Sequence, residues 1–186
     1  MSGDRKVRIG YRDCTMTHNP QAHRSSATRE TILEAMAHLA SERRYAAITI
    51  VDLIDRAGIG RSTFYEHFGN KDQVLLALLD PILLQLANAA SNRAPRPALQ
   101  HVVRHVWERR QLFRVVLGSR IAARLEQRLS DLILERRRRA DPGQSALLAA
   151  ATASGQLAML RSWTGGAVPM PVPDFAQQLI LFSSPQ

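Results

Sequence analysis

The spacing of apolar residues predicts that this chain is built from helices. From Thr28 onward, apolar side chains recur every three or four positions, which is the period of a helix with one buried face. These positions are Ile32, Leu33, Met36, Leu39 and Ala40. Thr28 or Ser26 can cap this helix. No stretch alternates apolar and polar residues with β-branched enrichment, so we expect an all-α fold without a sheet.

Caps and turns delimit the next two helices. Thr49 is a plausible N-cap with Asp52 three residues later, which resembles a capping box, and the helix extends to Ala57. Gly58 ends it, because glycine tolerates the left-handed backbone found after many helices. A third, very short helix is predicted from Gly60 to Phe68.

The rest of the chain reads as longer helices. Asn70 with Gln73 predicts a capping box for a fourth helix that is apolar on most faces. Pro81 either kinks that helix or follows a new cap at Asp80. Further helices are predicted near 97–117, 119–139, 143–164 and 173–183, and the second of these has a possible break near Glu126.

Charge and composition narrow the class of partner. The chain of 186 residues has 25 basic and 16 acidic side chains, a net charge of +9 that favours polyanions. Residues 1–71 hold 11 basic and 8 acidic side chains, so net charge alone locates no binding face. Cys14 is the only cysteine, the N-terminus lacks an apolar signal core, and the apolar stretch 74–90 is interrupted. We expect a cytoplasmic protein with no membrane partner.

The stretch "AGIGRSTFYEHFGNKD" has the layout of a helix-turn-helix. Ile59, Phe64 and Phe68 are expected to point inward, which leaves a narrow polar outer face suited to a major groove. Lys71 lies in the first turn of the next helix, where its charge and free backbone N–H groups can share a phosphate. Without a wider motif, Tyr65 and His67 would read as rim residues of a small core.

Residues 28–79 resemble the DNA-binding domain of tetracycline-repressor (TetR) family regulators, because A-G-I, T-F-Y-x-H-F and x-N-K-D-x-x-L occur in order at the family's spacings. Arg44 departs from a usual glycine, and Gly60 from a usual serine or threonine. The resemblance implies phosphate contacts, or supports for them, at Thr63, Tyr65, His67 and Lys71, and base selection at Arg61 and Ser62. The expected DNA-binding residues are Thr49, Arg61, Ser62, Thr63, Tyr65, His67 and Lys71.

The resemblance also implies a homodimer formed by the last two helices, and the small and apolar residues of these helices are compatible with it. The alternative for these residues is an ordinary internal core. The interface candidates are Leu148, Ala151, Gly155, Ala158, Phe175, Leu179 and Phe182. An inducer pocket is expected in the same half, although aromatics at helical spacing more often form core. Its candidates are His101, Arg104, His105, Trp107, Phe113, Met159 and Trp163. The two histidines lie one turn apart without a neighbouring carboxylate or thiol ligand, so no metal and no cofactor are expected.

The sequence therefore predicts three parts: a flexible basic arm (1–26), a helix-turn-helix DNA-binding domain (27–71) and a helical ligand-binding and dimerisation domain (72–186). The arm either reaches DNA or is a solvated tail. We expect a repressor that binds a palindromic operator as a dimer and is released by a small-molecule effector. The alternatives are a helical protein-interaction module or a ligand-independent DNA-binding regulator. No enzyme is expected, since "GRSTF" carries Phe64 where a nucleophile elbow needs glycine.

Overall fold

The computed structural model describes residues 20–91, 96–139 and 141–183, and every regular element within these ranges is helical. In chain order the elements are α1 (Pro20–Glu42), the 3-10 helix η1 (Tyr45–Ala47), α2 (Ile50–Ala57), α3 (Arg61–His67), α4 (Lys71–Ala89), α5 (Arg96–Glu108), α6 (Arg110–Leu117), α7 (Ile121–Arg138), α8 (Ala146–Thr164) and α9 (Val172–Ser183). The prediction of an all-α fold is confirmed.

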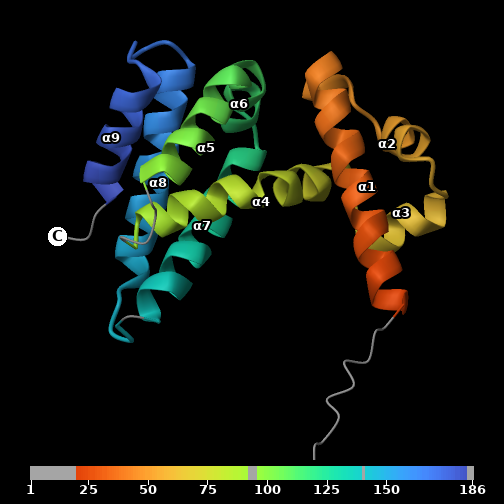
Figure 1. The fold of residues 1–186 in the computed structure, drawn as a ribbon, viewed down its shortest axis with the longest axis horizontal. Helices are drawn as coiled ribbons and strands as arrows, with labels where there is room; N and C mark the ends of the chain where they lie inside the picture. The colour runs from red at the N-terminus through yellow and green to blue at the C-terminus, as the bar shows by residue number, and fades with distance from the viewer. Residues whose placement is uncertain (1–19, 92–95, 140, 184–186) are drawn as a thin grey trace, which may run out of the picture.

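The helices form two groups that α4 connects (Figure 1). We call α1, η1, α2 and α3 the head, and α5 to α9 the body. In the head, Ile32, Leu53 and Phe64 are fully buried and form the centre of a small core. Helix α4 packs on α1 at one end and on α5, α7 and α9 further along, so one apolar core runs from the head into the body.

The first helix begins earlier than its apolar pattern predicted. Helix α1 starts at Pro20, so residues 20–26 belong to a helix and not to a flexible arm. Residues 25–27 and 29–31 of α1 are exposed, and a helical turn without a buried face has no apolar period to reveal it. The remainder of the expected arm, residues 1–19, lies outside the described residues.

Two of the three predicted helix boundaries around α2 and α4 are confirmed in detail. The Thr49 hydroxyl accepts the N–H of Asp52 while the Asp52 carboxylate accepts the N–H of Thr49, so the capping box is complete. Gly58 has φ 64° and ψ 34°, the predicted left-handed conformation. The box of α4 differs: the Asn70 side chain accepts the N–H of Gln73, but the Gln73 side chain accepts the N–H of Gly69.

In the remainder of the chain the structure differs from the predicted boundaries, or excludes one of their alternatives, at four points. The helix expected over 97–117 is interrupted at Arg109, whose φ of −107° and ψ of 25° are not helical. Helix α7 continues without a break past Glu126. Helix α8 starts at Ala146, directly after its N-cap Ser145. Helix α4 continues through Pro81, so no new helix begins at Asp80. The Asp80 carboxylate instead accepts two hydrogen bonds from Arg128.

Helix α4 is long and apolar enough to cross a membrane by length and composition, contrary to the expectation drawn from the interruptions in this stretch. Its packing gives another reason for its apolar surface. Side chains along its whole length, from Val74 to Ala89, are buried against α1, α5, α7 and α9. Such burial is typical of the central helix of a folded core.

Candidate nucleic-acid interface

Helix α3 divides into an inner apolar face and an outer polar face. Phe64 is fully buried and Phe68, its C-cap, is nearly so. Arg61, Ser62 and Tyr65 are exposed, whereas Thr63 and His67 are half-buried at the edges of the helix. Seven residues make two helical turns, so this face is narrow enough to enter a major groove.

The inner face holds α3 against the rest of the head. The Phe64 ring packs edge-on against Tyr65, with centroids 5.5 Å apart, and lies 6.3 Å from Phe68. The guanidinium of Arg29 on α1 stacks over the Phe68 ring at 4.6 Å. Sequence reasoning missed Arg29, because the two residues lie far apart in the chain and only the folded head brings them together. The outer residues of α3 therefore project from a fixed support.

Thr49 lies at the start of α2, with its hydroxyl occupied by the capping box. The hydroxyl donates to Asp52 Oδ2 at 2.7 Å, and Arg43 forms an ion pair with Oδ1 of the same carboxylate at 3.0 Å. The Thr49 hydroxyl and backbone N–H, together with Arg43, hold the pKa of Asp52 below its usual value. A second ion pair, between Arg56 and Glu42 at 2.7 Å, fastens α2 to the end of α1.

Lys71 is bound to the backbone of the head. Its ammonium donates to the carbonyls of Ile48 at 2.6 Å, Tyr45 at 3.2 Å and Ala46 at 3.5 Å, and it lies 4.7 Å from the centroid of the Tyr45 ring. The sequence identified the residue as a phosphate contact but gave no sign of these partners. In this structure Lys71 closes the turn between η1 and α2, and its phosphate contact stays a prediction.

A buried carboxylate beside Lys71 was also missed. Asp72 is 9% exposed and accepts a hydrogen bond from the Tyr45 hydroxyl at 2.5 Å. Burial and the Asp72 carboxylate raise the pKa of Tyr45, so the phenol is neutral. Arg120 and Arg124, at the start of α7, lie 3.8 and 4.0 Å from the other oxygen of Asp72. This cluster joins the head, α4 and the body.

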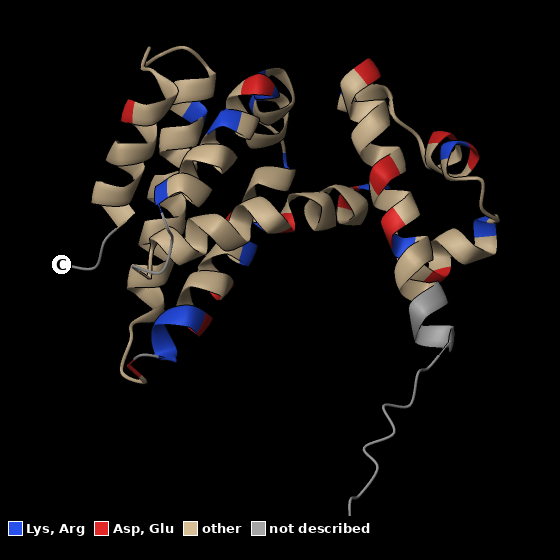
Figure 2. Ribbon diagram, in the orientation of Figure 1, with Lys and Arg blue, Asp and Glu red and all other residues tan. Residues whose placement is uncertain are grey.

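The two departures from the family pattern are accommodated without strain. Arg44 has φ −64° and ψ 137°, so the chain between α1 and η1 needs no left-handed residue there. Gly60 is the N-cap of α3 in an extended conformation and contributes no side-chain cap. A serine or threonine at position 60 would supply one. Cations are not concentrated on α3, in agreement with the charge count from the sequence (Figure 2).

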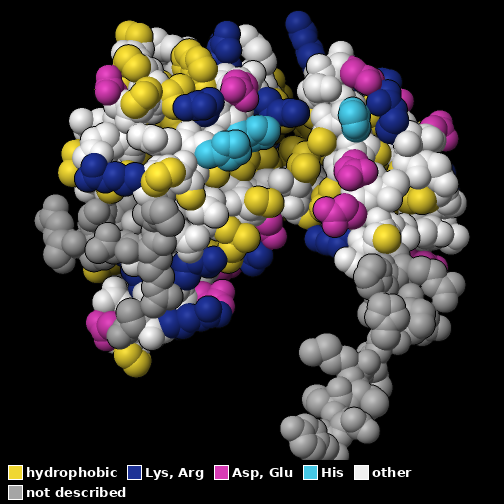
Figure 3. All heavy atoms as spheres, viewed as in Figure 1, with side chains coloured by type: hydrophobic (Ala, Val, Ile, Leu, Met, Phe, Trp, Pro, Cys, Tyr) yellow, Lys and Arg dark blue, Asp and Glu magenta, His cyan; other side chains and the backbone are white. Residues whose placement is uncertain are grey.

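The expected pocket residues separate into three groups. Trp107 stacks on Trp163 with centroids 4.7 Å apart, and Trp163 stacks on Phe175 at 4.0 Å. Trp163 and Met159 border a largely apolar cavity of about 410 Å³ between α8 and α9. Its lining residues are Ala158, Met159, Ser162, Trp163, Val168, Met170, Phe175 and Gln178. Figure 3 shows apolar side chains around the loop that joins these helices.

The other five pocket candidates do not line that cavity, and Trp107 reaches it only through its stacking on Trp163. Phe113 is buried in the core between α6 and its neighbours. His101 and Arg104 are exposed on α5, and His105 is half-buried there, where burial and then the nearby Arg109 lower the pKa of its imidazole. Among the described residues, no three His, Cys, Asp or Glu side chains are grouped so as to hold a metal ion.

The interface candidates on α8 and α9 also separate by burial. Leu148 and Phe182 are 57% and 47% exposed, and Ala151 and Ala158 are exposed beside them. Phe175 and Leu179 are buried within the subunit's own core. Gly155 lies under the Phe182 ring, since a Cβ there would be 2.1 Å from Phe182 Cζ.

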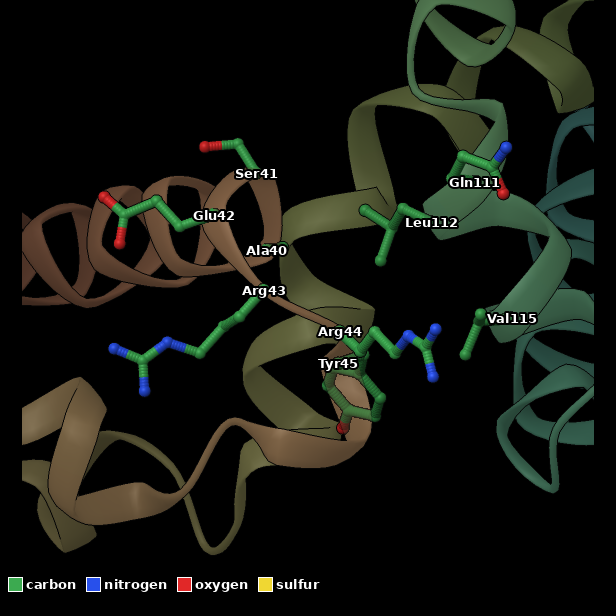
Figure 4. A pocket seen from close by; sticks show the side chains of 9 residues that line it. All are labelled: Ala40, Ser41, Glu42, Arg43, Arg44, Tyr45, Gln111, Leu112 and Val115. Carbon is green, nitrogen blue, oxygen red and sulfur yellow. The ribbon is translucent and has the colours of Figure 1, made fainter.

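A cleft of about 410 Å³ separates the head from the body (Figure 4). On the head side it is bordered by the end of α1 and by Arg44 and Tyr45. On the body side it is bordered by Leu112 and Val115 of α6. The cleft leaves α4 as the main connection between the two units.

A family model and the curated relatives both indicate the tetR family that the sequence motifs resemble. The model described as bacterial regulatory proteins, tetR family, matches residues 32–78. The HTH-type transcriptional repressor Rv3405c of Mycobacterium tuberculosis (strain ATCC 25618 / H37Rv) is 32% identical over 136 residues, which cover 71% of this chain and 69% of the relative. EthR, an HTH-type transcriptional regulator of Mycolicibacterium smegmatis (strain ATCC 700084 / mc(2)155), is 35% identical over 83 residues, which cover 42% of this chain and only 38% of the relative.

Solved structures share the fold at lower identity. A TetR transcriptional regulator from Streptococcus agalactiae 2603V has a TM-score of 0.54 and 22% identity, covering 88% of this chain and 97% of that one. FadR of Thermus thermophilus, a TetR-family transcriptional repressor in complex with lauroyl-CoA, has a TM-score of 0.52 and 17% identity, covering 83% and 92% of the two chains. These likenesses extend over the head and the body together.

Proposed function

We propose, from the premise that this chain belongs to the tetR family of bacterial regulatory proteins, that it represses transcription by binding an operator through α3. The observation that carries the proposal is the exposed face of α3, with Arg61, Ser62 and Tyr65 projecting from a helix anchored by buried Phe64. Arg61 can reach guanine O6 and N7, while a Tyr65 hydroxyl suits a phosphate. Thr63 and His67 would support those contacts from the edges of the helix.

One recognition helix of this length reads few bases, so we infer a homodimer on a palindromic operator. The exposed apolar side chains of α8 and α9, Leu148 and Phe182 among them, are the expected contact. Light scattering tests this with Leu148→Glu, which is expected to give monomers, and Val51→Glu as the control. Val51 is 56% exposed on α2, so its substitution makes the same change in charge on a remote surface.

We infer that a small apolar effector releases the DNA. The cavity between α8 and α9 supports this, because its lining is apolar apart from Ser162 and Gln178. A ligand there would contact Trp163 and quench its fluorescence, and the chain has only two tryptophans. The expected site of action is the cytoplasm, and neither catalysis nor a resident cofactor is required.

The decisive experiment is selection of source-genome fragments on the purified chain, followed by sequencing of what is retained. A recovered palindrome would support the proposal, with Arg61→Ala relaxing discrimination at one position by about 1–3 kcal/mol and Tyr65→Phe weakening all sequences alike. Arg138→Ala is the matched control, since Arg138 is exposed at the far end of α7. Absence of any salt-dependent binding would favour the helical interaction module instead.

A further inference from the structure

A second cavity lies where the head meets the start of α7. It has a volume of about 560 Å³ and is bordered by residues of η1, α2, α4 and α7. Two of the residues that border it, Thr49 and Lys71, are among the DNA-binding residues that were expected from the sequence. Two others, Arg120 and Arg124, come from the body. The body thus presents basic side chains to the same space as the DNA-binding head.

The charges around this cavity do not balance. Three cations, Lys71, Arg120 and Arg124, face one carboxylate, Asp72, which already accepts a hydrogen bond from Tyr45. The two arginines lie 3.8 and 4.0 Å from Asp72, which is too long for a direct hydrogen bond. Their side chains are 89% and 58% exposed, so their donors remain open to solvent. Asp72 therefore neutralises at most one of the two.

The spacing of the two arginines suits a single anion. Arg120 is the N-cap residue of α7 and Arg124 follows it by four positions, so both lie on the same side of the helix. Two guanidinium groups converging in this way can bind a phosphate through several charge-assisted hydrogen bonds. The shared cavity places that phosphate beside the start of α2 and α4.

We propose that Arg120 and Arg124 bind a backbone phosphate of the DNA, so that the DNA contact extends from the head onto the body. This inference rests on the proposed function. A phosphate contact positions the duplex but carries no base preference, so the two arginines contribute to affinity for every sequence. A free anion has the same chemistry, and the experiment separates the two sources.

The test measures binding of a labelled random-sequence duplex over a series of NaCl concentrations. The variants are Arg120→Gln/Arg124→Gln, the charge-retaining Arg120→Lys/Arg124→Lys, and the control Arg138→Gln/Arg139→Gln at the other end of α7. In the first variant the slope of log Kobs against log[NaCl] is expected to become shallower by about 0.9 per chain, the value for one lost phosphate contact. The lysine variant and the control are expected to keep the wild-type slope.

Each other outcome overturns the inference for a different reason. Weaker binding with an unchanged slope and a lower melting temperature would mean that the arginines only position Asp72. An unchanged slope, together with binding of inorganic phosphate by the wild type but not by the glutamine variant, would mean that the site takes a free anion. A wild-type chain that shows no salt-dependent binding would remove the proposed function itself, and this inference with it.

Discussion

Replacing Gly58 with alanine isolates the backbone energy of the turn that orients α3. Gly58 has φ 64° and ψ 34°, and a Cβ added there meets no atom within 4 Å. Any loss of stability must therefore come from the left-handed backbone and not from a clash. That conformation costs an L-residue about 1–2 kcal/mol. Alanine also restricts the unfolded chain, which returns about 0.4–1 kcal/mol. The free energy of unfolding is expected to fall by about 1 kcal/mol.

Gly60→Ala is the matched control two residues away. Gly60 has φ −77°, which alanine adopts freely, and its added Cβ would make only ordinary contacts of 3.8 Å with the hydroxyls of Ser62 and Thr63. Alanine is a poorer N-cap than glycine, and this loss offsets the gain from a stiffer unfolded chain. Its expected effect on stability is close to zero.

Guanidinium chloride denaturation followed by circular dichroism measures both variants, with equal m-values required for the comparison. A Gly58→Ala variant as stable as the wild type would refute the left-handed turn. A loss several times larger than expected would reveal a steric contact where the structure has open space. DNA affinity under native conditions should change little, because a loss of this size leaves the head folded.

Three further predictions concern α4 and the capping box. Tyr45→Phe should lower the free energy of unfolding by about 1.5–3 kcal/mol, because Asp72 loses a buried hydrogen bond. Tyr65→Phe, at an exposed ring, is the control and should leave the denaturation curve unchanged. Equal effects of the two substitutions would contradict this account. The pKa of Asp52 is lower in the folded than in the unfolded chain, so its contribution to stability is present above the unfolded pKa and is lost as pH falls through the folded pKa. Asp52→Asn should therefore flatten the acid limb of a curve of stability against pH. An unaltered acid limb would contradict this role of Asp52. Pro81→Ala, at an exposed position inside α4, should raise the melting temperature in a thermal melt by restoring a helical N–H, and an unchanged or lower melting temperature would contradict this.

Local chemistry explains which parts of the fold could be predicted from the sequence. Thr49, Asp52 and Gly58 act through neighbours within four residues, so their roles can be seen in the chain itself. The interruption at Arg109 cannot, because "WERRQLF" contains no glycine or proline and every residue in it tolerates a helix. Pro20 could have predicted the early start of α1, because proline is favoured in the first turn of a helix.

In the candidate site, too, the sequence predicts features within one helix but not contacts between distant helices. The inward and outward faces of α3 follow from helical spacing, and the burial of Phe64 and Phe68 confirms them. The partners of Asp72 could not be predicted, because Tyr45 lies 27 positions before it and Arg120 almost twice as far after it. Spacing within one helix carries no information about contacts between helices that are distant in the chain.

Lys71 shows why a motif residue does not define a binding site by itself. Its ammonium has three N–H donors, and three backbone carbonyls of the head already accept from it. A phosphate that took one of these donors would leave a carbonyl of the turn before α2 without its partner, which opposes the contact. Within the described residues, Arg120 and Arg124 donate no such backbone hydrogen bonds, and their only carboxylate partner in these contacts, Asp72, lies 3.8 and 4.0 Å away. If a phosphate enters this cavity, the arginines can therefore bind it directly, while Lys71 contributes mainly through its charge.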